Sequence, residues 1–544
     1  MTFFGWFFHF YRSAWSFWLK ETRFFLPVLA LFFASVLNSF SNENVYVSRF
    51  WHNHQPLYWP DWNSNGSQTQ RGQYAWDSIV LKPGQNYGGL SPKQHPENDL
   101  VEIFDKVDRK NAYQFGPRNS LGRVNANGGF AISYSGSLID NVRQLGAGGH
   151  LGYQGNWNAG IREARGWRTQ NGAGSTRMDM LGFTYHHSLG PLLPKSVFRK
   201  EIQIFKQAWW KAWGGNSDLS DHSKGFFPTE MAFSRHMVDV LSGEGYQWVI
   251  VASHHLSRTL PDYMGSVNTS PELGNWGIHS TPPNKADQVN ATSGGGWWFG
   301  SGNINPIKAY NYSPFAYQLH RAKFVNPETG QEKTILMVPS DDVLSYQYGY
   351  ADEGVGKITS YISPYVSDPN RPAIIMPSTD GDNAWGGGSS SWDGAAPTLM
   401  NNGTYPGVAI QDFVNQYGAA ADTIHIEDGA WIFPEDDWGS PNFLKWIEPP
   451  VATVANRGVT TVPGTQIDME TPGFALKFYS YAPLMAGANW CETAEQILRD
   501  EGGSVQAWKI QAPYDWDGTW TNPNDVELAW HIFLKGLDSG FNYY

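Results

Sequence analysis

The chain has 544 residues with 38 Lys plus Arg and 50 Asp plus Glu, so its formal net charge at pH 7 is −12. The length allows a large core and more than one domain, and the negative charge argues against nucleic acid or an anionic membrane surface as the main partner. The single cysteine, Cys491, excludes an intrachain disulfide and a cysteine-based zinc site.

Aromatic residues make up 15% of the chain and include 26 Trp. So many indole rings rarely all fit inside a core, because Trp is seldom fully buried. Flat aromatic faces also stack on sugar rings. The excess therefore fits either a carbohydrate partner or an aromatic-rich core.

Residues 1–43 are predicted to be a signal peptide or an N-terminal anchor. Scattered basic residues precede an uncharged apolar stretch at 24–37, which is short for a membrane span and typical of the apolar part of a signal peptide. Small and polar residues at 35–41 suit cleavage. We therefore expect export to the periplasm or the cell exterior, with membrane contact only through this segment if it stays uncut.

Seven β-type runs follow from residue 45 onward. Six of them place apolar residues first and polar groups last, in the strings HNHQP, TYHH, PTE, SHH, PSDD and STDGD. Parallel strands bring their carboxyl ends to one face, where sites are built, and near-continuous apolar strands suit burial on both faces. The pattern predicts an α/β fold, a distorted parallel (β/α)7 barrel. Its strands are predicted at 45–51, 130–135, 180–187, 225–228, 246–255, 333–342 and 371–382.

The rest of the pattern gives a predicted domain layout. The catalytic barrel is expected to span 44–421, interrupted by a Gly/Asn/Trp/Ser-rich insertion at 260–313 that is typical of an excursion or lid. Residues 422–544 are expected to form a C-terminal loop and mainly helical region over the barrel mouth, where it completes the cleft. Helices are predicted at 99–110, 196–213, 237–243, 493–500 and 526–537.

Two acidic residues follow predicted strands and are the first candidates for a site. Glu230 comes after the strand at 225–228, and Asp380 follows the apolar run at 373–378. Alone, such a Glu is usually a solvated loop residue, and the string Asp-Gly-Asp-Asn is good turn chemistry. Together, two carboxylates delivered to one barrel mouth are what glycosidic bond cleavage needs. We therefore predict that this pair is the functional centre.

Histidines gather at the same predicted strand ends. His52 and His54 alternate on one strand, so both side chains point to the same side. Two imidazoles at this spacing can ligate one metal ion, or they can be hydrogen-bonded core residues. His254 and His255 are expected to be structural.

Four motifs in chain order resemble those of glycoside hydrolase family 57, the retaining enzymes that act on α-glucans. Each motif alone is weak, but four in the right order at predicted strand ends are fairly specific. A later GAWI stretch at 429–432 is also similar to the family, and the resemblance covers roughly residues 47–544. The four motifs are FWHNHQPLYW at 50–59, TYHHSLGPLL at 184–193, FPTEMA at 227–232 and TDGDNAW at 379–385.

The resemblance implies a retaining double displacement without a cofactor, with Glu230 as the nucleophile and Asp380 as the acid/base. Three departures bear on substrate choice more than on reaction type: an Asp where the family usually has Glu, a weakly similar closing motif, and an insertion without a counterpart. The resemblance further implies substrate binding by His52, His54, Gln55, His187 and Asp382, and Trp385 and Trp431 are candidates to stack on glucose rings or to be core residues.

The expected partner is a polysaccharide or oligosaccharide, cleaved by an amylase-like or amylopullulanase-like enzyme. Transfer to a sugar hydroxyl, as in a 4-α-glucanotransferase or a branching enzyme, would use the same residues. A metal-dependent polysaccharide deacetylase or mannosidase on a related barrel would instead use His52, His54 and an Asp from 380–382 as ligands. A catalytically inactive sugar-binding protein is a further alternative, against which both carboxylates argue. The sequence does not define the oligomeric state.

Overall fold

A computed structural model gives the fold of this chain. Its contacts separate Met1–Asn44 from a compact unit formed by Val45–Tyr544, and the predicted signal or anchor segment, 1–43, lies outside the described residues. Within the described ranges, no helix combines the length and the hydropathy that a bilayer-crossing segment needs. These ranges are 44–57, 59–62, 68–73, 75–76, 79, 100–170, 174–257, 259–262, 267–268, 288–291, 298–299, 308–309, 311–341, 355–356, 358–381, 396–426, 428–430, 472–512 and 519–538.

Most strands of the fold run parallel and belong to two sheets. One sheet has the order β16-β2-β5-β6, and the other has the order β17-β13-β14-β8-β7, in which only the β13–β14 pair is antiparallel. A short parallel pair, β1 with β15, lies outside both sheets. The strands of these two sheets and of this pair are β1 Val45–Val47, β2 Arg49–Asn53, β5 Phe130–Tyr134, β6 Met178–Met180, β7 Gly225–Phe226, β8 Trp248–Ala252, β13 His320–Val325, β14 Glu332–Ser340, β15 Ala373–Ile375, β16 Ser378–Asp380 and β17 Asp422–Thr423.

Two isolated parallel bridges join the sheets to each other. Gly182, just after β6, pairs with Phe226 on β7. Asp341, just after β14, pairs with Pro377, just before β16. The neighbours therefore follow a cyclic order of β2, β5, β6, β7, β8, β14 and β16, which is the order of a distorted (β/α)7 barrel. The predicted α/β class with parallel strands is confirmed. At the two joints, single bridges replace a continuous ladder.

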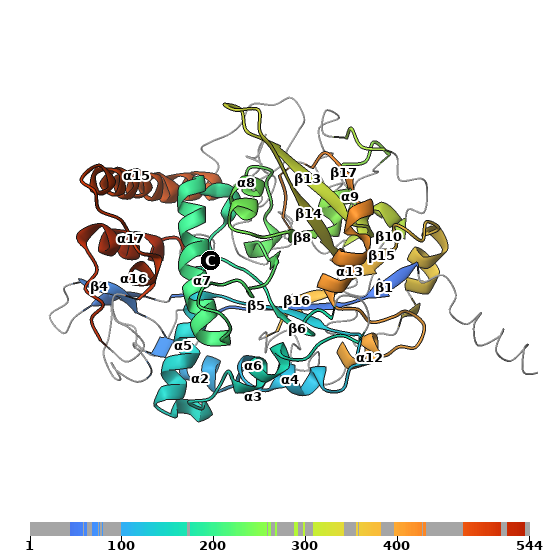
Figure 1. Cartoon of the computed structure of the whole chain (residues 1–544), viewed down its shortest axis with the longest axis horizontal. Coiled ribbons are helices and arrows are strands. Elements are labelled where there is room, and N and C mark those ends of the chain that lie inside the picture. The colour runs from blue at the N-terminus through green and yellow to red at the C-terminus, as the bar shows by residue number, and fades with distance from the viewer. Residues whose placement is uncertain are drawn as a thin grey trace, which may run out of the picture. The chain divides into compact units, whose positions relative to one another are not determined.

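Helices follow the strands and cover their outer side (Figure 1). The longest of them near the site is α7, whose apolar residues Val197, Phe198, Ile202 and Phe205 are buried at helical spacing. The helices are α2 Leu100–Asp105, α3 Val107–Tyr113, α4 Gly116–Leu121, α5 Gly136–Ala147, α6 Ala159–Arg165, α7 Lys195–Trp213, α8 Met237–Gly243, α9 Ser253–Ser257, α12 Ala396–Met400, α13 Ile410–Tyr417, α15 Pro472–Asp500, α16 Ala507–Gln511 and α17 Asp525–Lys535.

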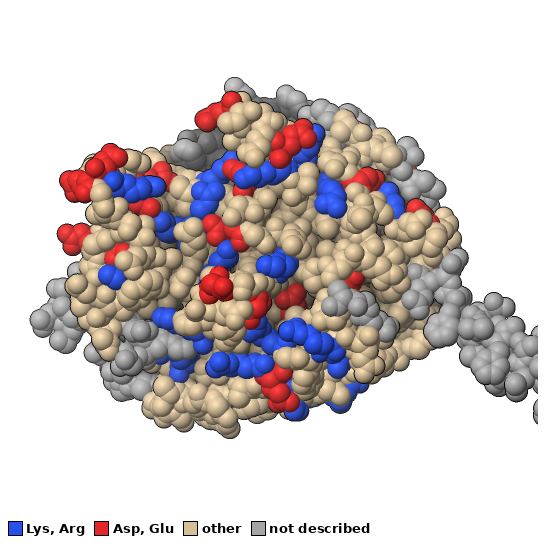
Figure 2. Space-filling view, viewed as in Figure 1, with Lys and Arg blue, Asp and Glu red and all other residues tan. Residues whose placement is uncertain are grey.

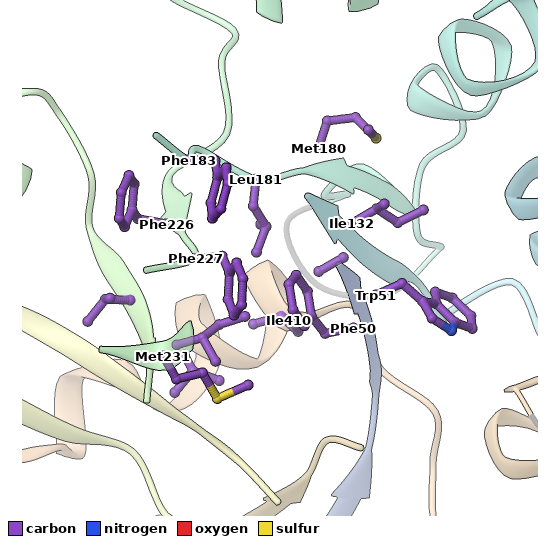
Figure 3. Close-up of a cluster of buried hydrophobic side chains, with 14 of the residues drawn as sticks. Phe50, Trp51, Ile132, Met180, Leu181, Phe183, Phe226, Phe227, Met231 and Ile410 are labelled. Carbon is purple, nitrogen blue, oxygen red and sulfur yellow. The ribbon is translucent and has the colours of Figure 1, made fainter. Parts of the chain in front are cut away.

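An aromatic cluster fills the space between the facing strands (Figure 3). The rings of Phe50 and Phe227 lie 4.6 Å apart, and those of Phe183 and Phe227 lie 5.5 Å apart. The His52 ring rests on the same cluster, 5.0 Å from Phe183 and 4.9 Å from Phe227. The apolar core therefore forms the floor beneath the first histidine of the predicted site.

The C-terminal helices pack against α7 (Figure 1). Ser196 on α7 donates a hydrogen bond to Glu492 on α15, and Lys200 Nζ lies 3.0 Å from Glu495 Oε2. Beyond α17, the Asp538 carboxylate accepts a hydrogen bond of 3.1 Å from the amide of Leu57. This end of the chain is thus tied to the segment that follows His54. Its predicted role in completing the cleft stays a prediction.

Several segments differ from the elements that the sequence pattern predicts, and the runs 45–51 and 371–382 are each two strands, β1 with β2 and β15 with β16. The strand predicted at 180–187 ends at Met180, because the chain turns at 185–186 and His187 has a left-handed φ of 55°. The run 246–255 ends at Ala252, where α9 begins, and the helix expected at 99–110 is two helices separated by Lys106. The predicted helix at 493–500 is only the last part of α15.

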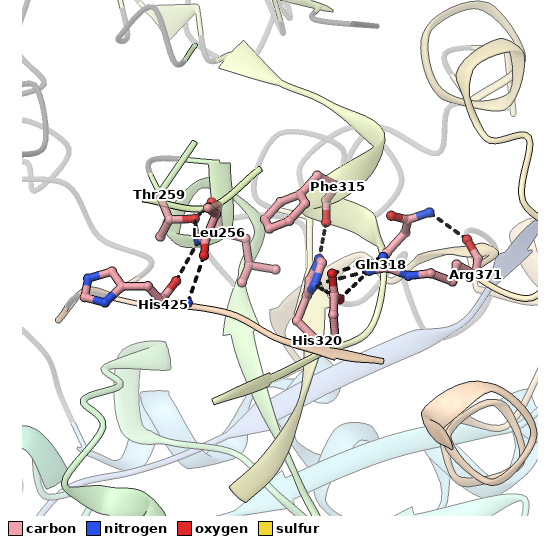
Figure 4. A network of polar contacts seen from close by, with 9 residues as sticks. Leu256, Thr259, Phe315, Gln318, His320, Arg371 and His425 are labelled. Carbon is pink, nitrogen blue, oxygen red and sulfur yellow. Dashed lines mark hydrogen bonds and ion pairs between the residues drawn. The ribbon is translucent and has the colours of Figure 1, made fainter. Parts of the chain in front are cut away.

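Strand β13 is one of several described strands, with β3 Trp59–Trp62, β4 Gln68–Gln73 and β17, that the sequence pattern did not predict. It pairs with β14 across a short turn in which Asn326 accepts from the amides of Glu328 and Thr329. Of the insertion at 260–313, only short segments are described, and its role as a lid stays a prediction. Asn290 from this insertion donates hydrogen bonds to Thr259 Oγ1 at 2.7 Å and to the carbonyl of His425 at 2.8 Å. Figure 4 labels the two acceptor residues, Thr259 and His425.

Charges of both signs are interspersed on the face in Figure 2. Some charged groups form ion pairs: the exposed Arg118 lies 2.6 Å from Glu163, and the largely buried Lys206 lies 2.9 Å from Glu244. Exposed pairs contribute only about 0–1 kcal/mol each. The parallel strands and their apolar faces therefore account for most of the stability of the fold.

We expect Gly225→Ala to lower the free energy of unfolding by about 1–3 kcal/mol, the usual cost of overpacking a core. An added Cβ would lie 2.2 Å from the Trp248 ring, so strand β7 would have to move. Chemical denaturation measures the change. The matched control is Gly356→Ala, whose Cβ would meet no atom within 4 Å; equal stability of both variants would contradict the tight packing of β7.

Candidate active site

The register of the sheet β16-β2-β5-β6 aligns three polar residues, Asp380, His52 and Ser133. His52 is the pairing partner of Asp380 on one side and of Ser133 on the other. Residues paired across neighbouring strands point to the same face of a sheet, so the Asp380 side chain lies on the His52 side. The ring fixes the contact to the next strand, with His52 Nδ1 2.7 Å from Ser133 Oγ.

The next histidine repeats this contact one step along the strands. His54 Nδ1 lies 2.8 Å from Ser135 Oγ, which also caps α5 by accepting from the Leu138 amide. Ser137 donates its proton to the carbonyl of Gln55, so the Ser135 hydroxyl is the donor in the 3.1 Å contact between the two serines. Ser135 then accepts from His54. This order of donors places the His54 proton on Nδ1 and leaves Nε2 as an acceptor.

His187 completes a stack of three imidazole rings. Its ring lies 3.9 Å from the His54 ring at an interplanar angle of 7°, and 4.9 Å from the His52 ring at 16°. Burial lowers the pKa of His52 to about 3, and burial together with the neighbouring imidazoles lowers the pKa of His54 and His187 well below the usual value. All three rings are therefore neutral near pH 7.

Glu230 approaches this stack from the second sheet. It sits in a short 3-10 turn, Thr229–Met231, directly after β7, and only 6% of its surface is exposed. Its Oε1 atom lies 3.7 Å from Nε2 of His187. The two residues also share a left-handed backbone, with φ of 56° at Glu230 and 55° at His187. Such conformations cost about 1–3 kcal/mol in residues other than glycine and cluster at active sites.

Gly429, the first residue of the GAWI motif, pairs with the segment that follows the Glu230 turn. Phe233, three residues after Glu230, pairs with Gly429 in an antiparallel bridge with hydrogen bonds of 2.8 and 3.2 Å. A Cβ on Gly429 would lie 2.7 Å from the His255 ring, so the close approach requires glycine. The structural role expected for His255 stays a prediction.

The structure brings five of the predicted site residues to one place. Asp380 pairs with His52, the His52 and His187 rings stack, and His187 touches Glu230, while His54 stacks on His187. Gln55 is buried, and its amide points to the Tyr113 hydroxyl at 3.3 Å. The other three candidates, Asp382, Trp385 and Trp431, lie outside the described residues.

The His54–His187 pair is poorly arranged for a metal ion. Imidazole lone pairs lie in the ring planes, and two parallel rings 3.9 Å apart cannot aim both lone pairs at one ion at the usual distance of about 2 Å. Across the described part of the chain, no group of three or more His, Cys, Asp or Glu side chains is placed to hold a metal.

The residues that support the stack were not predicted from the sequence. Ser133 and Ser135 belong to the predicted strand 130–135, but their contacts depend on the strand register. Glu201 on α7 is fully buried and accepts hydrogen bonds from His186 and Ser188, on either side of His187. A signal for it existed: Glu201 stands four residues from both Val197 and Phe205, within the apolar stripe of its helix.

Comparison with known proteins shows that residues 49–273 of this α/β chain match glycosyl hydrolase family 57. The predicted resemblance to that family is therefore confirmed. The matched range contains the motifs of His52, His187 and Glu230 and ends before Asp380.

Three relatives illustrate the range of similar proteins. The chain is 28% identical over 562 residues to an alpha-amylase of Niallia circulans, covering 92% of this chain and 42% of the relative, so it spans less than half of that protein. It is similar to an exo-type maltose-forming amylase from Pyrococcus sp. ST04, with TM-score 0.46, 10% identity and coverage of 90% of this chain and 73% of the other. It is also similar to a 4-alpha-glucanotransferase from Thermococcus litoralis, with TM-score 0.40, 13% identity and coverage of 71% and 42%.

The buried histidines predict how stability depends on pH. The folded pKa of His52 is about 3 and its usual value is 6.5, so between these values the unfolded chain binds a proton that the folded chain does not. Stability is thus complete above pH 6.5 and falls as pH drops toward 3, by about 1.4 kcal/mol per pH unit for each such proton. We expect His52→Asn to reduce this slope, measured by urea denaturation at several pH values. An unchanged slope would show that His52 is protonated in the folded protein.

Proposed function

We propose that this protein is a retaining glycoside hydrolase that acts on α-glucans such as starch, glycogen and maltooligosaccharides. One observation carries the proposal: Glu230, in the turn that follows β7 of one sheet, and Asp380, on β16 of the other sheet, both adjoin the His52–His187 pair. The sequence places them 150 residues apart. The match to glycosyl hydrolase family 57 and the similarity to an alpha-amylase support the same reaction and substrate class.

In this proposal, the Glu230 carboxylate attacks the anomeric carbon while Asp380, as the acid, protonates the leaving glycosidic oxygen. A covalent glycosyl-enzyme forms on Glu230. Asp380 then takes a proton from water, and the resulting hydroxide displaces Glu230 with overall retention of configuration. A sugar hydroxyl in place of water would give transglycosylation by the same residues.

The neutral histidines suit this chemistry. A protonated imidazole at 3.7 Å would stabilise the Glu230 carboxylate and weaken it as a nucleophile. The lowered pKa of His187 avoids this, because its ring stays uncharged near pH 7. Neutral His52, His54 and His187 can instead exchange hydrogen bonds with sugar hydroxyls. We assign Gln55, Asp382, Trp385 and Trp431 to the substrate cleft through the family motifs alone.

The domain and export assignments belong to the same proposal. We assign catalysis to residues 44–421 and completion of the cleft to residues 422–544, supported by the Phe233–Gly429 bridge and the Leu57–Asp538 contact. Export follows from the signal-like pattern of residues 1–43.

We expect Glu230→Gln to lower kcat on maltoheptaose by about 10³-fold or more, because the nucleophile is lost. Asp380→Asn should lower kcat by about 10²–10⁴-fold, the usual range for a lost general acid. Glu163→Gln, which removes an exposed carboxylate paired with Arg118, is the matched control and should leave kcat unchanged. Near-wild-type turnover in either site variant would remove that residue from its role.

Product analysis on maltoheptaose tests the reaction type. Following the anomeric signals by NMR should show the α-anomer first, because two displacements retain configuration. Products longer than the substrate would indicate transfer rather than hydrolysis. Full activity in EDTA is expected, and loss of activity that zinc restores would favour the metal-dependent deacetylase or mannosidase instead.

A further inference from the structure

The turn that carries His187 is hydrogen-bonded to one buried carboxylate. Glu201, in the first half of α7, has no exposed surface. Its Oε2 atom accepts from the His186 amide at 2.9 Å and from the Ser188 hydroxyl at 3.2 Å, and its Oε1 atom lies 2.7 Å from His186 Nδ1. The carboxylate thus binds the residues immediately before and after His187 at three points.

These contacts explain how His187 keeps an unfavourable backbone. A left-handed φ of 55° persists in a bulky residue such as histidine only when its surroundings over-determine it. Three hydrogen bonds to one buried carboxylate supply that constraint, since bonds to a charged acceptor are shorter and stronger than neutral ones. Because Glu201 bonds to His186 and Ser188 on both sides, it fixes the direction in which the intervening side chain leaves the chain.

We infer that Glu201 is a positioning residue for the reaction: it orients His187, and through His187 it sets the surroundings of Glu230. The inference rests on the proposed function for its effect on turnover. His187 has little freedom in the site, since its ring lies 3.9 Å from His54 and its Nε2 atom lies 3.7 Å from Glu230 Oε1. A small rotation of the turn would change both contacts. Glu201 bonds to the turn itself, so its effect on Glu230 passes through His187.

The simplest alternative is that Glu201 only stabilises the fold. Removing hydrogen-bond partners from a buried group is destabilising in any protein, so a lower melting temperature would not distinguish the two roles. The test therefore needs a control that also removes a buried carboxylate next to α7 without touching the His187 turn. Glu495 on α15 fits, because it is largely buried and pairs with Lys200, the neighbour of Glu201.

Kinetics of Glu201→Gln and Glu495→Gln form the first part of the test. We expect Glu201→Gln to lower kcat on maltoheptaose by about 10- to 100-fold, because small misplacements of catalytic groups have effects of this size. KM should change much less, since the lost interaction acts in the transition state. Glu495→Gln should keep a kcat near that of the wild type. Equal losses in the two variants, or none in Glu201→Gln, would overturn the inference.

Histidine NMR forms the second part and needs no substrate. With ¹⁵N-labelled histidine, the ring signals of His187, assigned through a His187→Asn variant, should shift in Glu201→Gln and stay in place in Glu495→Gln. Unshifted His187 signals in Glu201→Gln would overturn the positioning role. If the wild type turns over no α-glucan, the proposed function fails, and the NMR result alone decides whether Glu201 orients His187.

A milder variant covers the case in which Glu201→Gln does not fold. Ser188→Ala removes one of the three donors and leaves the carboxylate with both bonds from His186. We expect kcat to fall by about fivefold, as for one lost hydrogen bond, and the His187 signals to shift in the same direction. Wild-type kcat together with wild-type His187 signals would again overturn the inference.

Discussion

The parallel pairing of β16, β2 and β5 is the constraint on which the site depends. One register sets Asp380 beside His52 and His52 beside Ser133, and it carries His54 to Ser135 one step further. Because side chains alternate between the faces of a strand, a slip of one residue would turn the histidines to the outer side. The same slip would separate both rings from the serines that hold them.

The surroundings of the histidines explain their chemical character. The aromatic cluster of Phe50, Phe183 and Phe227 shields the histidine rings from water on one side. The stacked histidine rings also shield one another. An imidazolium is poorly solvated in such a place, which is why burial dominates the lowered pKa of His52. Three titratable side chains therefore behave as uncharged hydrogen-bonding groups at neutral pH.

The strand ends and the residues on them could be predicted from the sequence, whereas the contacts that fix these residues in place could not. Parallel strands that are buried on both faces need continuous apolar runs, so the runs that stop before Glu230 and Asp380 can be recognised in the sequence. The local residues at 185–187 favour a strand, whereas the contacts that make this segment a turn come from Glu201, a residue on the next helix. The contacts of Ser133 and Ser135 depend on which strands are neighbours. Tertiary contacts of this kind leave only weak traces in a local pattern.

The two isolated bridges give the barrel a mechanical property. Asp380 belongs to the sheet of β16-β2-β5-β6 and Glu230 follows β7 in the other sheet, and these sheets meet at Gly182–Phe226 and Asp341–Pro377. The spacing of Asp380 and Glu230 therefore depends on the isolated bridges between the sheets and not on one continuous series of strand hydrogen bonds. Each of these two junctions has far fewer backbone hydrogen bonds than the sheets it joins. We therefore expect the two sheets to move relative to each other more easily than the strands within one sheet. The His52 ring of the first sheet lies 4.9 Å from the His187 ring, whose Nε2 atom lies 3.7 Å from Glu230 Oε1, so these two rings link the sheets at the site.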